Sequence, residues 1–215
     1  MKQYSNIYSL LMMGSSLAAA HAATLNLTSD FESDRDGWVH PVNSPNQTMV
    51  QSDGPFNQVL YVSSSGGSSA GSRLVVPNDS TAWIGDYTAA GITAVEMDLV
   101  NNSSSTLMMR LGIEGGGPGN RWTSSSPVTL NSSDRGRFRL EFSDLSSAGG
   151  NDLSAALANV SQIRILHTTS TGEWKGDNVS ASFIVDNITL VPEPSSLAFF
   201  LITAATLLPL RRRNT

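Results

Sequence analysis

Two carboxylates near opposite ends of the chain have the chemistry to bind a cation. Glu32 lies just after the first predicted strand, Thr24–Leu27, and Asp186 lies within the last predicted strand. If these two strands pair, the carboxylates lie close together. Carboxylates combined with backbone carbonyl oxygens suit Ca²⁺, which takes about six to eight oxygen ligands. The pair predicts a structural Ca²⁺ site, the one cofactor the sequence suggests, against the alternative of two solvated carboxylates at a sheet edge.

A second acidic pair, Asp34 and Asp36, offers an alternative for the same cation. The two residues form a D-x-D pattern. A complete calcium loop also needs a glycine at its sixth position and a glutamate at its twelfth, and the sequence here has neither.

Tryptophans could bind sugars, because an exposed aromatic ring can stack on the apolar face of a pyranose. Trp122 and Trp174 lie in predicted loops and are the better candidates for glycan platforms, although packing at a sheet edge is the favoured interpretation of each. Trp38 and Trp83 follow turns and are expected in the core.

Catalytic patterns are scarce. His40 and His167 are the histidines between residues 23 and 191, and neither a G-x-S-x-G elbow nor an H-E-x-x-H helix is present. Glu96 and Asp98 could in principle support glycosidase chemistry. They alternate with apolar residues, however, so a solvated strand face is the favoured interpretation, and we expect no enzymatic activity.

The elements that must position these residues are short strands. Apolar and polar residues alternate over many short runs separated by Gly, Asn, Asp, Ser and Pro, which predicts strands rather than helices. The clearest runs are Val95–Leu99, Leu107–Ile113, Phe138–Phe142, Ile163–Ile165 and Phe183–Leu190, with a bulge expected near Asp186; weaker ones are Thr24–Leu27, Gly37–Val42, Val59–Val62, Arg73–Val76 and Val128–Leu130. About ten such strands predict an all-β fold, a two-sheet antiparallel β-sandwich of the jelly-roll type.

Two segments depart from this pattern. Leu153–Val160 has a helical period, with Asn151 or Asp152 as its N-cap. Ser63–Ser72 is a low-complexity stretch that we interpret as a loop within the domain.

Charge and cysteine content narrow the function further. The chain of 215 residues has a formal net charge of −5 at pH 7 and no cysteine. An acidic chain is a poor partner for nucleic acid, whose phosphates need a basic surface. Neither disulfides nor a thiol nucleophile are available.

The first 22 residues have the features of a secretory signal peptide. Lys2 precedes an apolar segment, Ile7–Ala20, and Ala20-His21-Ala22 forms an A-x-A site. We expect cleavage after Ala22, which leaves a sandwich domain over residues 23–191.

The C-terminal residues 192–215 have three parts. A P-E-P motif is followed by a 14-residue apolar run, Leu197–Leu210, and then by Arg211, Arg212 and Arg213. A helix over that run is about 21 Å long, shorter than the roughly 30 Å hydrocarbon core. This length favours transient membrane insertion, and the arginines favour a cytoplasmic end.

This tail resembles the PEP-CTERM sorting signal of Gram-negative bacteria. The matching residues are Val191, Pro192, Glu193, Pro194 and Ser195, the apolar run and the three arginines. The resemblance implies export, recognition by an exosortase-type membrane peptidase and a location in the cell envelope or outside the cell.

The domain itself resembles carbohydrate-binding-module-like jelly rolls. The similarity lies in Asp30–Trp38 and in Val185-Asp186-Asn187-Ile188; Trp83–Tyr87 followed by Gly91-Ile92 is similar to laminin-B-like sandwiches. The resemblance implies a structural Ca²⁺ near Glu32 and Asp186. We therefore expect an exported, non-catalytic surface or matrix protein associated with extracellular polysaccharide. The alternative is a glycan-binding module with aromatic platforms, and an enzyme acting on polysaccharide is a less favoured third.

Overall fold

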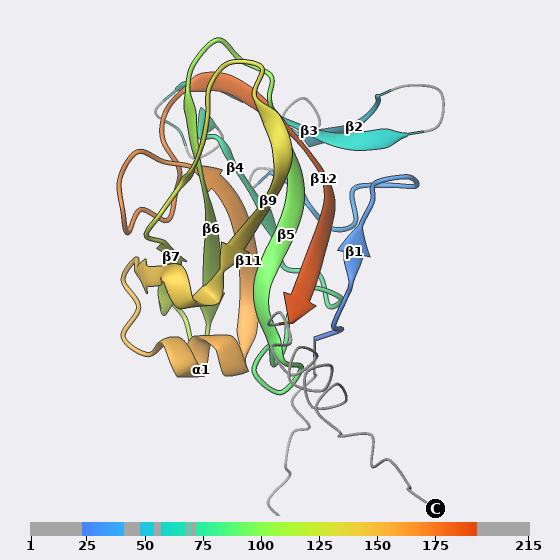
Figure 1. The fold of residues 1–215 in the computed structure, drawn as a ribbon. Helices are drawn as coiled ribbons and strands as arrows, with labels where there is room; N and C mark the ends of the chain where they lie inside the picture. The colour runs from blue at the N-terminus through green and yellow to red at the C-terminus, as the bar shows by residue number, and fades with distance from the viewer. Residues whose placement is uncertain (1–22, 41–47, 54–56, 68, 70–71, 193–215) are drawn as a thin grey trace, which may run out of the picture.

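The protein is a sandwich of two antiparallel β-sheets, seen in a computed structural model that describes residues 23–40, 48–53, 57–67, 69 and 72–192. The sheets lie face to face, and one short helix covers one end of the sandwich (Figure 1). The predicted all-β, two-sheet antiparallel fold is confirmed.

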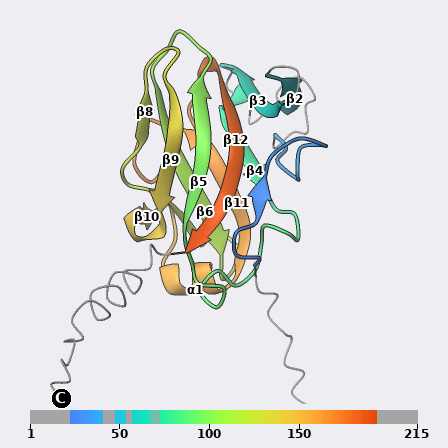
Figure 2. The same ribbon diagram turned by 45° about the vertical axis from the view of Figure 1, so that its right-hand side comes forward.

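The first sheet contains the chain's longest strand and both ends of the described domain. Its order is β2-β3-β12-β5-β9, and β1 pairs with β12. Its strands are β1 (Thr28–Ser29), β2 (Thr48–Ser52), β3 (Gln58–Ser65), β5 (Ile92–Asn101), β9 (Arg135–Glu141) and β12 (Ser180–Pro192). The central strands of this sheet lie side by side in Figure 2.

The second sheet has the order β10-β7-β6-β11-β4, and β8 pairs with β6. Its strands are β4 (Val75–Asn78), β6 (Leu107–Gly115), β7 (Arg121–Ser124), β8 (Val128–Leu130), β10 (Leu145–Ser147) and β11 (Val160–His167). All pairings in both sheets are antiparallel.

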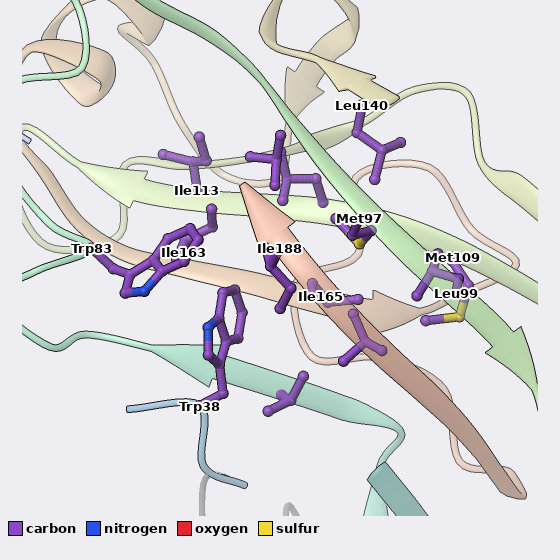
Figure 3. Close-up of a cluster of buried hydrophobic side chains, with 14 of the residues drawn as sticks. Trp38, Trp83, Met97, Leu99, Met109, Ile113, Leu140, Ile163, Ile165 and Ile188 are labelled. Carbon is purple, nitrogen blue, oxygen red and sulfur yellow. The ribbon is translucent and has the colours of Figure 1, made fainter. Parts of the chain in front are cut away.

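The core lies between the sheets because every second residue of the central strands is apolar. Met97 and Leu99 of β5 meet Met109 of β6 and Ile165 of β11 in this layer (Figure 3). Trp38 and Trp83 are both buried here, with ring centroids 5.1 Å apart in an edge-to-face arrangement. The prediction that these two tryptophans belong to the core is confirmed.

The helix and the bulge were also predicted. Helix α1 (Leu153–Ala158) has Asp152 as its N-cap, and the Asp152 side chain accepts a hydrogen bond of 2.9 Å from the Ala155 amide. The pairing of β12 with β5 shifts register between Asp186 and Thr189, which confirms the bulge. A 3₁₀ turn, η2 (Phe142–Asp144), follows β9.

Several boundaries were predicted wrongly. The first strand is Thr28–Ser29 rather than Thr24–Leu27, and no strand begins between Gly37 and His40. Strands β2, β7 and β10 were not predicted, because short polar runs such as Leu145–Ser147 carry too weak an alternation.

The predicted signal peptide and most of the predicted sorting tail lie outside the described residues. These include Ala20, Ala22, Glu193, Pro194, Ser195 and the three arginines. Val191 and Pro192 are the last residues of β12 and pair with Ala94 and Ile92. In the described part of the chain, no helix has the length and apolar character needed to cross a membrane.

Candidate functional site

The structure brings Glu32 and Asp186 into the same electrostatic environment. Pairing of β1 with β12 places Ser29 opposite Ile188, close to the bulge. Asp186 is 9% exposed, and burial raises the pKa of its carboxyl; the nearby carboxylates Asp98 and Glu32 raise that pKa further. Negative charge is therefore concentrated at this point of the first sheet.

The oxygens of this acidic pair already have protein partners. Asp186 Oδ1 accepts from the Asn187 amide at 2.8 Å, and Glu32 Oε1 accepts from the Gln58 amide at 3.0 Å. Among the described residues, no group of three or more His, Asp or Glu side chains is arranged to hold a metal ion. These side chains supply at most part of a calcium shell, so the Ca²⁺ site stays a prediction.

The alternative pair, Asp34 and Asp36, forms a hydrogen bond within its own turn. Asp34 Oδ1 accepts a hydrogen bond of 2.6 Å from the Asp36 amide. Burial raises the pKa of Asp36, and the Asp34 charge adds to the increase. Nothing in this geometry favours the pair over Glu32 and Asp186.

Trp122 and Trp174 lie on opposite sides of the second sheet. Trp122 is in strand β7, not in a loop, and pairs with Ile113, so its half-buried ring packs toward the core. Trp174 lies in the segment between β11 and β12 and is only 5% exposed. The predicted loop position is wrong for Trp122 and right for Trp174. Both rings are held by packing, the favoured expectation, and they cannot form one platform.

Trp174 instead packs on the outer face of the second sheet between two arginines. The Arg164 guanidinium lies 4.3 Å from the ring centroid and that of Arg121 lies 5.4 Å from it. Gly112 makes room beneath, because a Cβ there would lie 2.8 Å from the Trp174 ring. We call the surface formed by Arg121, Arg164 and Trp174 the arginine face.

The strand register explains how this face is assembled. Leu111 and Ile113 of β6 point into the core, so Gly112 and Glu114 point outward. Gly112 pairs with Arg164 of β11 on one side, and Glu114 pairs with Arg121 of β7 on the other. The two arginines thus flank β6 from opposite sides.

The two arginines differ in how their charge is balanced. Arg121 Nε lies 3.1 Å from Glu114 Oε2, whereas no ion pair of the described residues includes Arg164. Arg164 donates to Gln162 Oε1 at 2.7 Å and to the Trp174 carbonyl oxygen at 3.2 Å. Burial, with repulsion from Arg121, lowers the pKa of Arg164 to about 10. Arg164 therefore remains charged at neutral pH.

A groove of about 420 Å³ begins beside this face. It is lined by Glu114, Gly116, Gly117, Pro118, Asn159, Ser161 and Gln162. Burial opposes ionisation of Glu114, but hydrogen bonds from the Gly119 amide and from Arg121 hold the pKa of its carboxyl below the usual value. The groove thus offers an ionised carboxylate, amides and a hydroxyl next to two cations.

The remaining chemical candidates have structural partners. Glu96 pairs with Arg137 and Arg139, and Asp98 lies 3.8 Å from Arg137. His167 Nδ1 accepts from the Met108 amide at 2.9 Å, and burial lowers the pKa of this imidazole.

The sequence contained a signal for the arginine face that we did not use. Arg110, Gly112 and Arg164 occupy polar positions of two strands that were correctly predicted. The missing information was the register between these strands and the position of Trp174.

The fold is shared with known sugar-binding and sugar-cleaving proteins. A carbohydrate-binding module, CtCBM11, matches with a TM-score of 0.50 at 17% identity, over 80% of this chain and 96% of that one. An exo-β-agarase matches with a TM-score of 0.54 at 11% identity, over 80% of this chain. The match spans only 26% of the agarase chain.

A third match is the family 11 carbohydrate-binding module from Clostridium thermocellum in complex with a β-1,3-1,4-mixed-linked tetrasaccharide, with a TM-score of 0.47 at 15% identity, over 80% of this chain and 98% of that one. No family model and no curated protein matches the sequence. The match to CtCBM11 shows that the chain shares the sandwich fold of that carbohydrate-binding module.

Proposed function

We propose that the protein binds extracellular polysaccharide through the arginine face and the groove next to it. The observation that carries the proposal is the groove of about 420 Å³ lined by polar groups, among them Gln162, which accepts a hydrogen bond from Arg164 of the Arg164–Trp174 stack. Sugar hydroxyls need such alternating donors and acceptors, and ligand sites are usually concave and largely preformed. The similarity in fold to a carbohydrate-binding module supports this use.

In this proposal the protein binds without catalysing a reaction. Glu96 and Asp98, the acidic pair considered for glycosidase chemistry, form ion pairs with Arg137 and Arg139. All four residues lie on the first sheet, whereas the groove lies at the second. Glu114 is the one acidic residue among those that line the groove, whereas glycoside hydrolysis usually uses two facing carboxyl groups.

Affinity electrophoresis of the purified protein through gels with and without soluble polysaccharides tests the proposal. We expect retardation by at least one polysaccharide, weakened by Gln162→Ala because that amide borders the groove. Gln51→Ala, the same substitution on strand β2 of the first sheet, is the matched control and should migrate like the wild type. Unretarded migration in every gel would refute polysaccharide binding.

We also propose that the chain is exported and sorted to the cell envelope by its C-terminal tail, through secretion machinery and an exosortase-type peptidase. The support is the sequence pattern of Val191–Ser195, the apolar run and the three arginines. The intact mass of the protein from its native host tests this. Loss of residues 1–22 and of the residues after the P-E-P motif is expected, whereas a retained arginine end in the inner membrane would contradict sorting.

A further inference from the structure

The arginine face carries positive charge on an acidic protein. The chain has a net charge of −5, yet Arg121 and Arg164 lie on the same side of the second sheet and flank one strand. Glu114 forms an ion pair with Arg121, and the negative charges of Glu114 and Asp79 also act on Arg164. The two guanidinium groups are therefore the cations that this face offers to a ligand.

Arg164 is the less compensated of the two cations. Its hydrogen bonds go to an amide oxygen and a backbone carbonyl oxygen, both uncharged acceptors. A half-buried guanidinium without a carboxylate partner loses hydration that a nearby anion would replace. Gln162, which accepts one of these bonds, also lines the groove, so a ligand in the groove lies next to this charge.

Trp174 provides a second, independent observation: a buried hydrogen-bond donor on this face lacks an acceptor. The Trp174 side chain is only 5% exposed, and its indole Nε1 has no hydrogen-bond acceptor among the described residues. Buried donors without acceptors are uncommon in folded proteins. An acceptor-rich ligand at this face would suit both the indole and the guanidinium.

Arg121 makes the charge accessible. Its side chain is 37% exposed, while that of Glu114 is 14% exposed. Part of this side chain is therefore open to a ligand, whereas its Nε, which lies 3.1 Å from Glu114 Oε2, is buried.

From these contacts we infer that the polysaccharide recognised by the arginine face and its groove is anionic, with carboxylate or sulfate groups that pair with Arg121 and Arg164. This inference rests on the proposed polysaccharide binding and specifies its ligand class. The sugar hydroxyls contact Asn159, Ser161 and Gln162 in the groove, and the acidic group lies at its arginine border.

Titrations of the purified protein with polygalacturonate, dextran sulfate and a neutral mixed-linkage β-glucan test the ligand class. We expect binding to one or both anionic polymers, about tenfold or more tighter than to the neutral glucan, and weaker as salt rises because screening shortens the reach of the charges. The two anionic polymers distinguish a carboxylate from a sulfate ligand.

Variants then locate the binding. Arg121→Gln and Arg164→Gln should each weaken anionic binding about tenfold, the range expected for one charge-assisted hydrogen bond. Arg135→Gln on β9 removes the same charge from the first sheet and should leave binding unchanged. Glu114→Gln should strengthen binding, because it removes the competing carboxylate but keeps an acceptor for the Gly119 amide.

Each result has one meaning. Equal binding to neutral and anionic polymers, without salt dependence, would overturn the anionic inference but leave polysaccharide binding standing. Binding to none of the three, together with unretarded migration in every gel, would defeat both. Anionic binding that Arg135→Gln reduces as much as Arg121→Gln would show non-specific attraction and overturn the site. If Arg164→Gln fails to fold, the affinities of Arg121→Gln, at a more exposed position, and of Glu114→Gln still decide whether the arginine face binds the anionic polymer.

Discussion

The two outer faces of the sandwich both carry arginines, but neighbouring strands neutralise them differently. On the first sheet, register places Glu96 opposite Arg139 and Asp98 opposite Arg137, which we call the ion-pair face. On the second sheet, register places Gly112 opposite Arg164, and Trp174 occupies the space that glycine leaves. The first arrangement satisfies charge with charge, whereas the second leaves a cation stacked on a ring, with uncharged hydrogen-bond acceptors.

Removing Trp174 should have the largest effect of any single change on either face. Trp174→Ala deletes a 5% exposed ring, and such truncations cost about 3–5 kcal/mol of unfolding free energy. Chemical denaturation measures this loss. Trp122→Ala, at a half-buried position, should cost less. A loss below about 1 kcal/mol for Trp174→Ala would mean that the ring is not packed between the arginines.

Acid should destabilise the second sheet at the end of β11, where His167 pairs with Met109. Burial lowers the pKa of His167, whose Nδ1 accepts from the Met108 amide at the end of β11. A group with a lowered folded-state pKa contributes stability above its unfolded pKa of about 6.5 and loses it as pH falls toward the folded value.

Melting temperature measured from pH 7.5 to 5 checks this effect. We expect a fall below about pH 6.5 in the wild type and a smaller fall in His167→Gln. Identical profiles for the two proteins would contradict the assignment to this imidazole.

Calcium should act on the first sheet alone. The raised pKa of Asp186 means that its charge destabilises the fold at neutral pH, with the penalty absent below the unfolded pKa and complete above the folded one. Asp186→Asn should therefore raise the melting temperature in a chelator. If Ca²⁺ binds, millimolar calcium should raise the melting temperature of the wild type but not of the variant. A wild-type melting temperature that is the same in chelator and in calcium would refute the site.

The smallest effect is expected on the ion-pair face. Arg137 pairs with Glu96 at 3.0 Å, but its side chain is 51% exposed. Exposed pairs contribute about 0–1 kcal/mol, so Arg137→Ala should change the unfolding free energy by less than about 1 kcal/mol and leave polysaccharide binding intact. A larger loss of either would remove the contrast between the faces.

The sequence predicted the fold because the alternation of apolar residues is strong where strands are central. The central strands of the two sheets include Leu107–Ile113 and Phe183–Leu190, and their buried positions were predicted correctly. Strands at the edges, such as Leu145–Ser147, have little alternation to detect. Helix α1 was found because its cap and period are local features.

The site was predicted less well because it depends on register. The expected pairing of the first and last strands predicted that Glu32 and Asp186 approach each other, and in the structure the Glu32 charge raises the pKa of Asp186. The sequence did not show that Gly112 lies opposite Arg164, or that the Trp174 ring packs on Gly112. Contacts between strands about 50 residues apart leave no periodic trace in the chain.

Mapping an acidic oligosaccharide by nuclear magnetic resonance tests the central claim, that the arginine face is the binding face. Titration of the labelled protein with an oligogalacturonate should shift the amide signals of Gly112, Glu114 and Gln162 and the side-chain signals of Arg121 and Arg164. The signals of β5 and β9 should stay in place. Shifts centred on Glu96, Asp98 and their arginine partners, or no shifts at saturating ligand, would contradict the claim.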